Sequence, residues 1–155
     1  MIHLEMSTLI YKPLAQVFDF VSAPENDHQW QYGTLATARL SDGVIKAGTF
    51  FRSVGHLLGR RNVAAFEVTA YEFNKAIEFK SISGPLHLWS IYTFATTAAG
   101  TRITVSTRAH VVNFNYMDQD ILEYKIKKQL KENLRMLKNL LEEQVFSFEA
   151  YPVAG

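Results

Sequence analysis

The sequence predicts an α+β fold: a curved antiparallel β-sheet of about six or seven strands around a long C-terminal helix, with two short helices after the first strand. Three observations lead to this prediction. Apolar and polar residues alternate with period two through the first run and the middle of the chain, proline-bounded segments without alternation follow the first run, and apolar residues recur every three or four positions near the end. Because a chain of 155 residues can bury one sizeable core, we expect a single domain over residues 1–146 and a C-terminal tail over 147–155.

The N-terminal segment predicts a strand followed by two short helices. Residues 2–10 alternate apolar and polar side chains, which is the period of a half-buried strand. Pro13 stops the alternation, and residues 13–21 predict a short helix with proline in its first turn. A second short helix is expected from Ser22 to about Trp30.

Turn signals divide the middle of the chain into strands. Ser41-Asp42-Gly43, Gly84-Pro85 and Ala98-Ala99-Gly100 separate runs that alternate. Because each run has one apolar and one polar face, we expect an antiparallel sheet covered on one side only. The expected strands are 35–40, 49–54, 63–71, 76–83, 86–96 and 101–112.

The last part of the chain predicts a long amphipathic helix. From about Asp118 to about Gln144, apolar residues form one stripe and charged residues cover the remainder, over roughly 40 Å of helix. This stripe needs a partner, and the apolar face of the sheet is the only large surface available. A sheet curved around such a helix is difficult to fill with side chains alone, so we expect a cavity, and apolar cavities with a few polar groups bind small ligands.

Composition and charge exclude several classes of protein. Sixteen Lys and Arg balance 15 Asp and Glu, a net charge of +1, so we expect no nucleic-acid partner. No apolar run reaches the roughly 20 residues that cross a bilayer, and the charged start does not fit a signal peptide, which predicts a cytoplasmic protein without stable membrane insertion. The absence of Cys excludes thiolate chemistry and disulfides. Five scattered His residues and the lack of nucleotide-binding glycine motifs predict neither a metal nor another cofactor.

Four segments carry a resemblance to a known family: residues 10–21, 26–30, 100–104 and 131–138. In this order and spacing they resemble the START/Bet v 1-like superfamily, also called SRPBCC or polyketide cyclase/dehydrase-like proteins, over the chain up to about residue 144. The resemblance implies the helix-grip fold with a hydrophobic cavity between the sheet and the long helix. It also implies a hydrophobic ligand, since members carry lipids, sterols, quinones or polyketides, and some catalyse cyclisation or dehydration.

The strand at 86–96 offers the most informative candidates. If Phe94 faces the helix, Ser90 and Tyr92 face it too and supply polar groups inside an apolar space, although Tyr92 packing without ligand contact is the alternative. Trp89 and Ile91 then lie on the convex face and form a dimer contact. The other interpretation shifts the register by one residue, and Trp89 lines the cavity.

Further candidates surround the expected cavity. Trp30 closes one end as part of the core, and an inward Arg52 would need an anionic partner, whereas on the other strand parity it lies on the surface. Tyr116 is expected at the opposite rim and Tyr124 at the edge of the helix stripe. The expected ligand-binding residues are Trp30, Arg52, Phe66, Ser90, Tyr92, Phe94, Thr107, Tyr116, Tyr124 and Leu130.

Two functions remain open at this point. The first is a monomeric or homodimeric protein that binds a hydrophobic or aromatic small molecule, and the second is a cofactor-independent cyclase or dehydratase. An enzyme of that kind needs an inward His or carboxyl group with a shifted pKa, and the predicted inward faces contain none, which favours binding. A protein-interaction module has no support beyond Trp89 and Ile91. The aromatic residues of the tail predict that segment 146–153 folds back onto the body or onto a neighbouring subunit.

Overall fold

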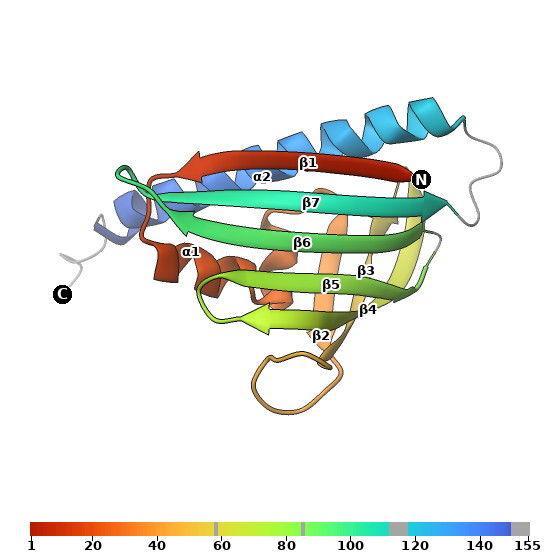
Figure 1. Ribbon diagram of the computed structural model, residues 1–155, viewed down its shortest axis with the longest axis horizontal. Helices are drawn as coiled ribbons and strands as arrows, with labels where there is room; N and C mark the ends of the chain where they lie inside the picture. Colours follow the sequence, from red (N-terminus) through yellow and green to blue (C-terminus); the bar gives the residue numbers. More distant parts are fainter. Residues whose placement is uncertain (58, 85, 112–117, 150–155) are drawn as a thin grey trace.

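The computed structural model describes residues 1–57, 59–84, 86–111 and 118–149. A seven-stranded sheet, a short helix, a short 3₁₀ helix and a long C-terminal helix make up this part of the chain, which confirms the predicted fold class (Figure 1). The elements follow in the order β1 (Ile2–Ile10), α1 (Leu14–Val21), η1 (Pro24–Gln29), β2 (Thr34–Arg39), β3 (Phe50–Leu57), β4 (Arg60–Glu72), β5 (Ala76–Ser83), β6 (Leu86–Thr96), β7 (Thr101–Val111) and α2 (Gln119–Glu149).

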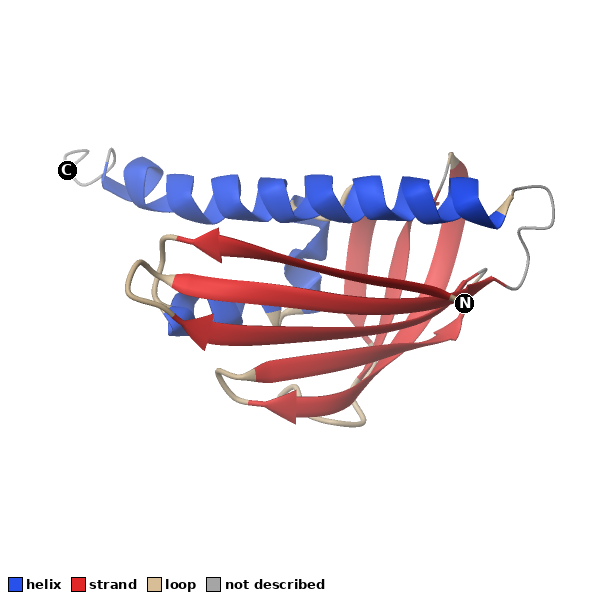
Figure 2. Ribbon diagram, turned by 45° about the horizontal axis from the view of Figure 1, so that its top comes forward, coloured by secondary structure: helices blue, strands red, loops and turns tan. Residues whose placement is uncertain are grey.

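The sheet is antiparallel, with the strand order β1-β7-β6-β5-β4-β3-β2. Neighbours in sequence pair with each other from β2 to β7, and β1 joins the far side by pairing with β7 from Ile2 opposite Ala109 to Ile10 opposite Thr101. In Figure 2 the sheet bends strongly and α2 extends along its open side. This is the helix-grip arrangement.

Irregularities in β4 accompany the bend. Its register against β5 shifts between Ala65 and Phe66 and again between Val68 and Ala70. Such bulges bend a strand and increase its twist. β4 lies between the strands that pack under α1 and those that continue to β2. The bulges in β4 therefore help the sheet to curve.

The buried core forms two clusters. The larger contains Phe18, Phe51 and Ile103 together with Leu134, Leu137 and Leu141 from the C-terminal half of α2. The smaller contains Ile2, Leu4, Leu86, Ala109 and Leu122, so it packs against the N-terminal half of α2. Leu130 is partly buried and contacts both clusters. The two halves of the helix are therefore anchored separately.

The hairpin between β3 and β4 is longer than expected. Gly55 belongs to β3, whose backbone passes so close to the start of β2 that a Cβ on Gly55 would lie 2.1 Å from the carbonyl oxygen of Gly33. Only glycine permits this approach. The expected loop from Gly55 onward is therefore mostly strand, with β4 beginning at Arg60.

The predicted end of the long helix near Gln144 is wrong, because α2 extends to Glu149. No glycine or proline occurs between these positions to stop a helix, and the next proline is Pro152. Residues 147–149 of the expected tail therefore continue the helix. The predicted folding back concerns residues 146–153, of which 146–149 continue α2 and 150–153 lie outside the described part of the chain.

None of the helices in the described ranges has an apolar stretch long enough to span a membrane.

Candidate functional site

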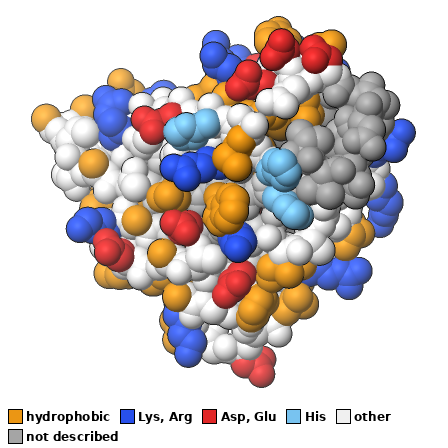
Figure 3. Space-filling model, turned by 45° about the vertical axis from the view of Figure 1, so that its right-hand side comes forward, with side chains coloured by type: hydrophobic (Ala, Val, Ile, Leu, Met, Phe, Trp, Pro, Cys, Tyr) orange, Lys and Arg blue, Asp and Glu red, His pale blue; other side chains and the backbone are white. Residues whose placement is uncertain are grey.

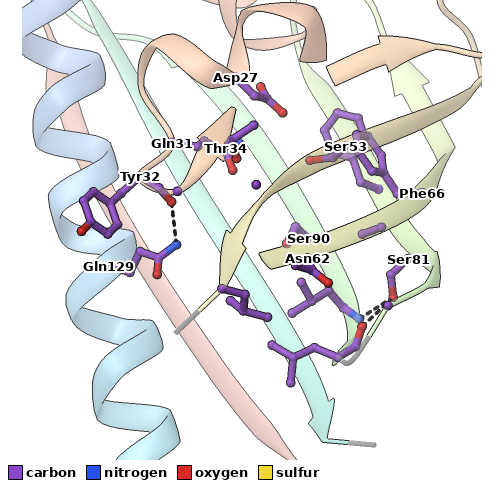
Figure 4. A pocket seen from close by; sticks show the side chains of 18 of the residues that line it. Asp27, Gln31, Tyr32, Thr34, Ser53, Asn62, Phe66, Ser81, Ser90 and Gln129 are labelled. Atoms are coloured by element: carbon purple, nitrogen blue, oxygen red, sulfur yellow. Dashed lines mark hydrogen bonds between the residues drawn. The ribbon is translucent and has the colours of Figure 1, made fainter. Parts of the chain in front are cut away.

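A pocket with a volume of about 240 Å³ lies inside the fold (Figure 4). Its walls come from η1 and the loop after it, from strands β3 to β6, from Val21 at the end of α1, from Thr34 at the start of β2, and from Gln129 on α2. Leu130, next to Gln129, lies where the two core clusters meet. The site is therefore a space between separately packed halves of the core. Tyr32, a residue that is 77% exposed, lies on its solvent side.

Aromatic rings form a continuous wall of this pocket. Trp30 meets Tyr92 edge to face with ring centroids 6.3 Å apart, and Tyr92 meets Phe79 in the same way at 5.8 Å. Phe79 contacts Phe66 at 5.5 Å, and Phe51 stacks on Phe66 at 5.4 Å. Four strands and the residue that follows η1 contribute these rings, so the wall is held from several directions. A wall of this kind suits a flat apolar ligand.

Two serine hydroxyls in the wall are already hydrogen-bonded. Ser81 accepts a hydrogen bond from the backbone N–H of Leu88 at 2.8 Å and donates to the carbonyl of Leu86 at 3.2 Å. The hydroxyls of Ser90 and Thr107 are 3.0 Å apart and bond to each other. These groups satisfy one another in the sheet, so they add polarity to the wall with limited capacity for a ligand.

Two further polar side chains in the wall have hydrogen-bonding groups without a partner among the described residues. Ser53 lies on β3 and Asn62 on β4, and Figure 4 shows both among the side chains of the pocket. Within the described part of the chain, neither side chain makes a hydrogen bond. Both are therefore available to a ligand or to water.

An acidic residue, Asp27, lies at the end of the pocket formed by η1. Its residue surface is partly exposed, but its carboxyl group is enclosed by protein, and this burial, reinforced by the charge of Glu25, raises its pKa well above the usual range. Burial also raises the pKa of Tyr92, with a further contribution from Asp27, against the lowering effect of a hydrogen bond with Gln31. The indole Nε1 of Trp30 is buried without a hydrogen-bond partner among the described residues. This end of the pocket thus combines a carboxyl and a phenol, and an unpaired N–H donor is buried in the protein beside them.

The rim of the pocket is held through the backbone of Tyr32. Its N–H donates to Oδ1 of Asn133 at 2.7 Å, and its carbonyl accepts from Nε2 of Gln129 at 3.0 Å, as Figure 4 shows for the second bond. The next carbonyl, of Gly33, accepts from the backbone N–H of His56 at 2.7 Å. Helix, loop and β3 are therefore joined at this rim.

Four of the expected ligand-binding residues line the pocket: Trp30, Phe66, Ser90 and Tyr92. Three others face the interior but lie in the packed core. Phe94 packs against the ring of Phe18 at 5.1 Å, Thr107 bonds to Ser90, and Leu130 contacts both core clusters. Their position on the inward face was predicted, but α1 fills the space beside Phe94.

Three of the expected residues do not belong to this pocket as described. Arg52 is exposed because β3 turns Phe51 and Ser53 inward, so the inward alternative is wrong, the surface alternative holds, and Arg52 does not line this pocket. Tyr124 is 66% exposed and does not line the pocket. Tyr116 lies outside the described residues.

The exposure of residues on the convex face of the sheet shows which way Trp89 on β6 points. Trp89 is 37% and Ile91 is 39% exposed, and the Nζ of Lys80 lies 5.1 Å from the Trp89 ring centroid. The alternative in which Trp89 lines the cavity is wrong. The face in Figure 3 shows apolar, His and oppositely charged side chains interspersed. A homodimer contact through Trp89 stays a prediction.

Sequence reasoning missed Asp27, the inward carboxyl whose expected absence favoured binding over catalysis. The segment 26–30 that contains it contributed to the family resemblance, but a six-residue 3₁₀ helix has no periodicity from which a direction can be read. Asn62, Ser53 and Gln129 were also missed. Among the described residues, no group of three or more His, Asp or Glu side chains is placed to hold a metal ion.

Comparison with known proteins identifies the family. The family model described as polyketide cyclase / dehydrase and lipid transport matches residues 1–142. The chain belongs to this family. No curated protein sequence matches it.

Solved structures of this family's fold superimpose on nearly the whole chain. A START superfamily protein from Mycobacterium smegmatis has a TM-score of 0.79 at 15% identity, over 93% of this chain and 99% of that one. The Zhui aromatase/cyclase from a Streptomyces species has a TM-score of 0.74 at 13% identity, over 92% and 94%. A protein from Thermus thermophilus has a TM-score of 0.72 at 18% identity, over 94% and 97%. At these identities the likeness concerns the fold.

Proposed function

We propose that this protein binds a hydrophobic or aromatic small molecule in the pocket between the sheet, η1 and α2. One observation carries the proposal: a volume of about 240 Å³ bounded by the rings of Trp30, Tyr92, Phe79 and Phe66. The family, whose description includes polyketide chemistry and lipid transport, gives independent support.

The volume sets the size of the ligand. A dry cavity of about 150 Å³ accommodates benzene, so about 240 Å³ corresponds to a body of two rings. Ligand pockets usually measure about 300–1,000 Å³, and this one lies just below that range. We therefore expect a compact ligand rather than a diacyl lipid or a compound of many rings.

Binding can be tested with prodan, an uncharged two-ring ketone whose fluorescence reports an apolar environment. We expect saturable binding by the full chain, and native mass spectrometry of the purified protein should show any co-purifying small molecule. The absence of both would contradict the proposal.

A matched pair of variants locates the binding site. Ser53 is half-buried and faces the pocket, so Ser53→Phe places a ring in the ligand's space, and we expect prodan affinity to fall about tenfold or more. Ser7 is exposed on β1, so Ser7→Phe makes the same change away from the pocket and should leave affinity unchanged. Equal effects of the two variants would contradict binding in this pocket.

A cyclase or dehydratase is the second candidate, favoured by Asp27 beside Tyr92. In a dehydration one group removes a proton next to a ketone and another protonates the departing hydroxyl, so that water leaves. A carboxyl with a raised pKa suits the donor role. Incubation with a β-hydroxy ketone of two-ring size, with mass-spectrometric detection of water loss, tests this candidate. Turnover that Asp27→Asn abolishes while prodan binding persists would support it, and no turnover would leave binding as the function.

A further inference from the structure

Asn62 on β4 reverses the usual pattern of a strand. Its neighbours in sequence, Arg61 and Val63, point outward, and Val63 is 45% exposed, whereas Asn62 is half-buried and lines the pocket. A strand with one wet face normally turns its polar residues outward, and asparagine is depleted in strands in general. The reversal gives up apolar burial in favour of an amide inside the fold, which is typical of positions that serve a site.

The neighbours of this amide in the β3–β4 hairpin are small. Asn62 lies opposite Gly55, and Ser53 lies opposite Ala64, the next inward residue of β4. None of these three neighbours has a side chain larger than that of serine. Figure 4 shows the Asn62 side chain among those that line the pocket. Its amide group therefore borders the open volume, where a ligand can meet it.

The amide of Asn62 offers a donor and an acceptor side by side. Its Nδ2 can donate two hydrogen bonds and its Oδ1 can accept two, and neither atom has a partner among the described residues. The amide of Gln129, by contrast, already donates to the carbonyl of Tyr32. A free asparagine amide recognises a complementary edge through two parallel hydrogen bonds, as it does with adenine in DNA. The complementary group on a small molecule has an N–H next to a carbonyl.

The aromatic wall begins about one ligand length from this amide. Asn62, Ala64 and Phe66 follow one another along the inner side of β4, and four residues of strand span roughly 13 Å. A two-ring molecule hydrogen-bonded to Asn62 can therefore extend over the small side chain of Ala64 to the ring of Phe66. Phe79, 5.5 Å from Phe66 between ring centroids, continues the apolar surface there. The polar edge and the apolar body of one ligand thus meet different parts of the pocket.

We propose that Asn62 selects the polar edge of the ligand: the pocket takes an uncharged two-ring compound with an N–H beside a carbonyl, such as a lactam, in preference to an isostere that lacks the N–H. This inference rests on the proposed binding function and narrows it, because an apolar pocket alone would not distinguish the two compounds by this group.

Carbostyril and coumarin are matched probes for this selection. Both have two fused rings and a carbonyl, and they differ in the neighbouring ring atom, which is N–H in the lactam carbostyril and oxygen in the lactone coumarin. Isothermal titration of the full chain measures both affinities. Coumarin can accept a hydrogen bond from Nδ2 of Asn62 but offers no donor to Oδ1, so we expect carbostyril to bind more tightly.

Asn62→Leu keeps the size of the side chain and removes its hydrogen-bonding groups. We expect the ratio of carbostyril affinity to coumarin affinity to fall about fivefold or more in this variant. This ratio is decisive, because the cost of removing each probe from water is the same for both proteins. Asn139→Leu is the matched control, since Asn139 is exposed on α2 and does not line the pocket, and it should leave the ratio unchanged.

A second measurement does not depend on the folding of a variant, which circular dichroism checks. In nitrogen–proton correlation NMR of the wild type, the Nδ2 protons of Asn62 should shift when carbostyril binds. Hydrogen bonding to the ligand moves these signals, whereas a purely structural role of Asn62 would leave them in place.

The results separate this inference from the proposed function. An affinity ratio that Asn62→Leu leaves unchanged would overturn the role of Asn62, as would unshifted Nδ2 signals with carbostyril bound. Binding of prodan without binding of either probe would overturn the ligand class and leave the pocket as a binding site. If prodan and both probes fail to bind, the proposed function fails and this inference fails with it.

Discussion

Asn133, in the middle of α2, accepts a hydrogen bond at 2.7 Å from the backbone N–H of Tyr32, 101 residues earlier in the chain. Asn133 is buried and the bond itself is partly buried, so it connects the helix to the rim of the pocket. Its loss leaves a partly buried donor without this partner.

We therefore expect Asn133→Ala to lower the free energy of unfolding by about 1–3 kcal/mol and to increase hydrogen exchange at the amide of Tyr32. Urea unfolding and amide exchange measure the two effects. Gln129→Ala serves as the control, because Gln129 donates to the carbonyl of Tyr32 at a more exposed site and its loss should cost less. Equal protection of the Tyr32 amide in wild type and Asn133→Ala would contradict this account of the rim.

Glu142 predicts a pH dependence of stability. Burial acts to raise its pKa, but hydrogen bonds from Lys138 and from the backbone N–H of Tyr11, with the charges of Lys138 and Lys12, outweigh burial and lower the pKa below its ordinary value of 4.5. A folded-state pKa below the unfolded one stabilises the protein above pH 4.5, and this contribution disappears as the pH falls through the lowered value.

The corresponding experiment compares wild type with Glu142→Gln by urea unfolding from neutral to acidic pH. The variant should be less stable at neutral pH, and the difference should shrink as the pH drops below the ordinary value for Glu. Glu132→Gln is a suitable control, since Glu132 pairs with Arg135 on an exposed surface and should contribute little at any pH. A difference between wild type and Glu142→Gln that is constant with pH would show that the carboxylate's charge is irrelevant.

Gly55→Ala tests the close approach of β2 and β3. A Cβ there would collide with the carbonyl of Gly33, so the strands must separate, and we expect a loss of about 1–3 kcal/mol in unfolding free energy. Thermal unfolding measures it, with Ser53→Ala on the same strand as a control that should change little. An unaltered melting temperature for Gly55→Ala would mean that β2 and β3 can separate at Gly33 without a loss of stability.

Tyr92→Phe tests whether the buried hydroxyl serves the ligand. The ring packs in the aromatic wall and remains in the variant, so stability should change by less than about 1.5 kcal/mol. Prodan affinity should fall several-fold if the hydroxyl donates to the ligand. Unchanged affinity would mean that Tyr92 contributes only its ring.

The side of the sheet on which a residue lies could be predicted from the sequence, but not whether it meets the cavity. With Phe94 on the inner face, period two places Tyr92 inside and Trp89 outside, as the structure has them, although the sequence left open a register shifted by one residue. The same rule placed Phe94 itself at the ligand, yet Phe18 of α1 fills that end of the interior. The position of a cavity depends on which elements pack at each end of a strand, and no local pattern contains that information.

Two residues show where the pattern was ambiguous. On β3, Phe50 and Phe51 are adjacent aromatics, so the sequence supports either parity, and only packing leaves Phe50 39% exposed and Phe51 fully buried, with Arg52 outside. Asp27 lies in a 3₁₀ helix too short to have a recognisable face. Its direction follows from how η1 closes over the sheet, which is a tertiary outcome.

The attachment of Tyr32 through main-chain atoms has an evolutionary consequence. Every amino acid except proline supplies the N–H and carbonyl that Asn133 and Gln129 require, so almost any side chain can occupy this position without weakening the joint. Descendants of this protein can thus change the exposed side chain at the rim of the pocket, and with it the ligands that the pocket admits, while the backbone hydrogen bonds stay the same.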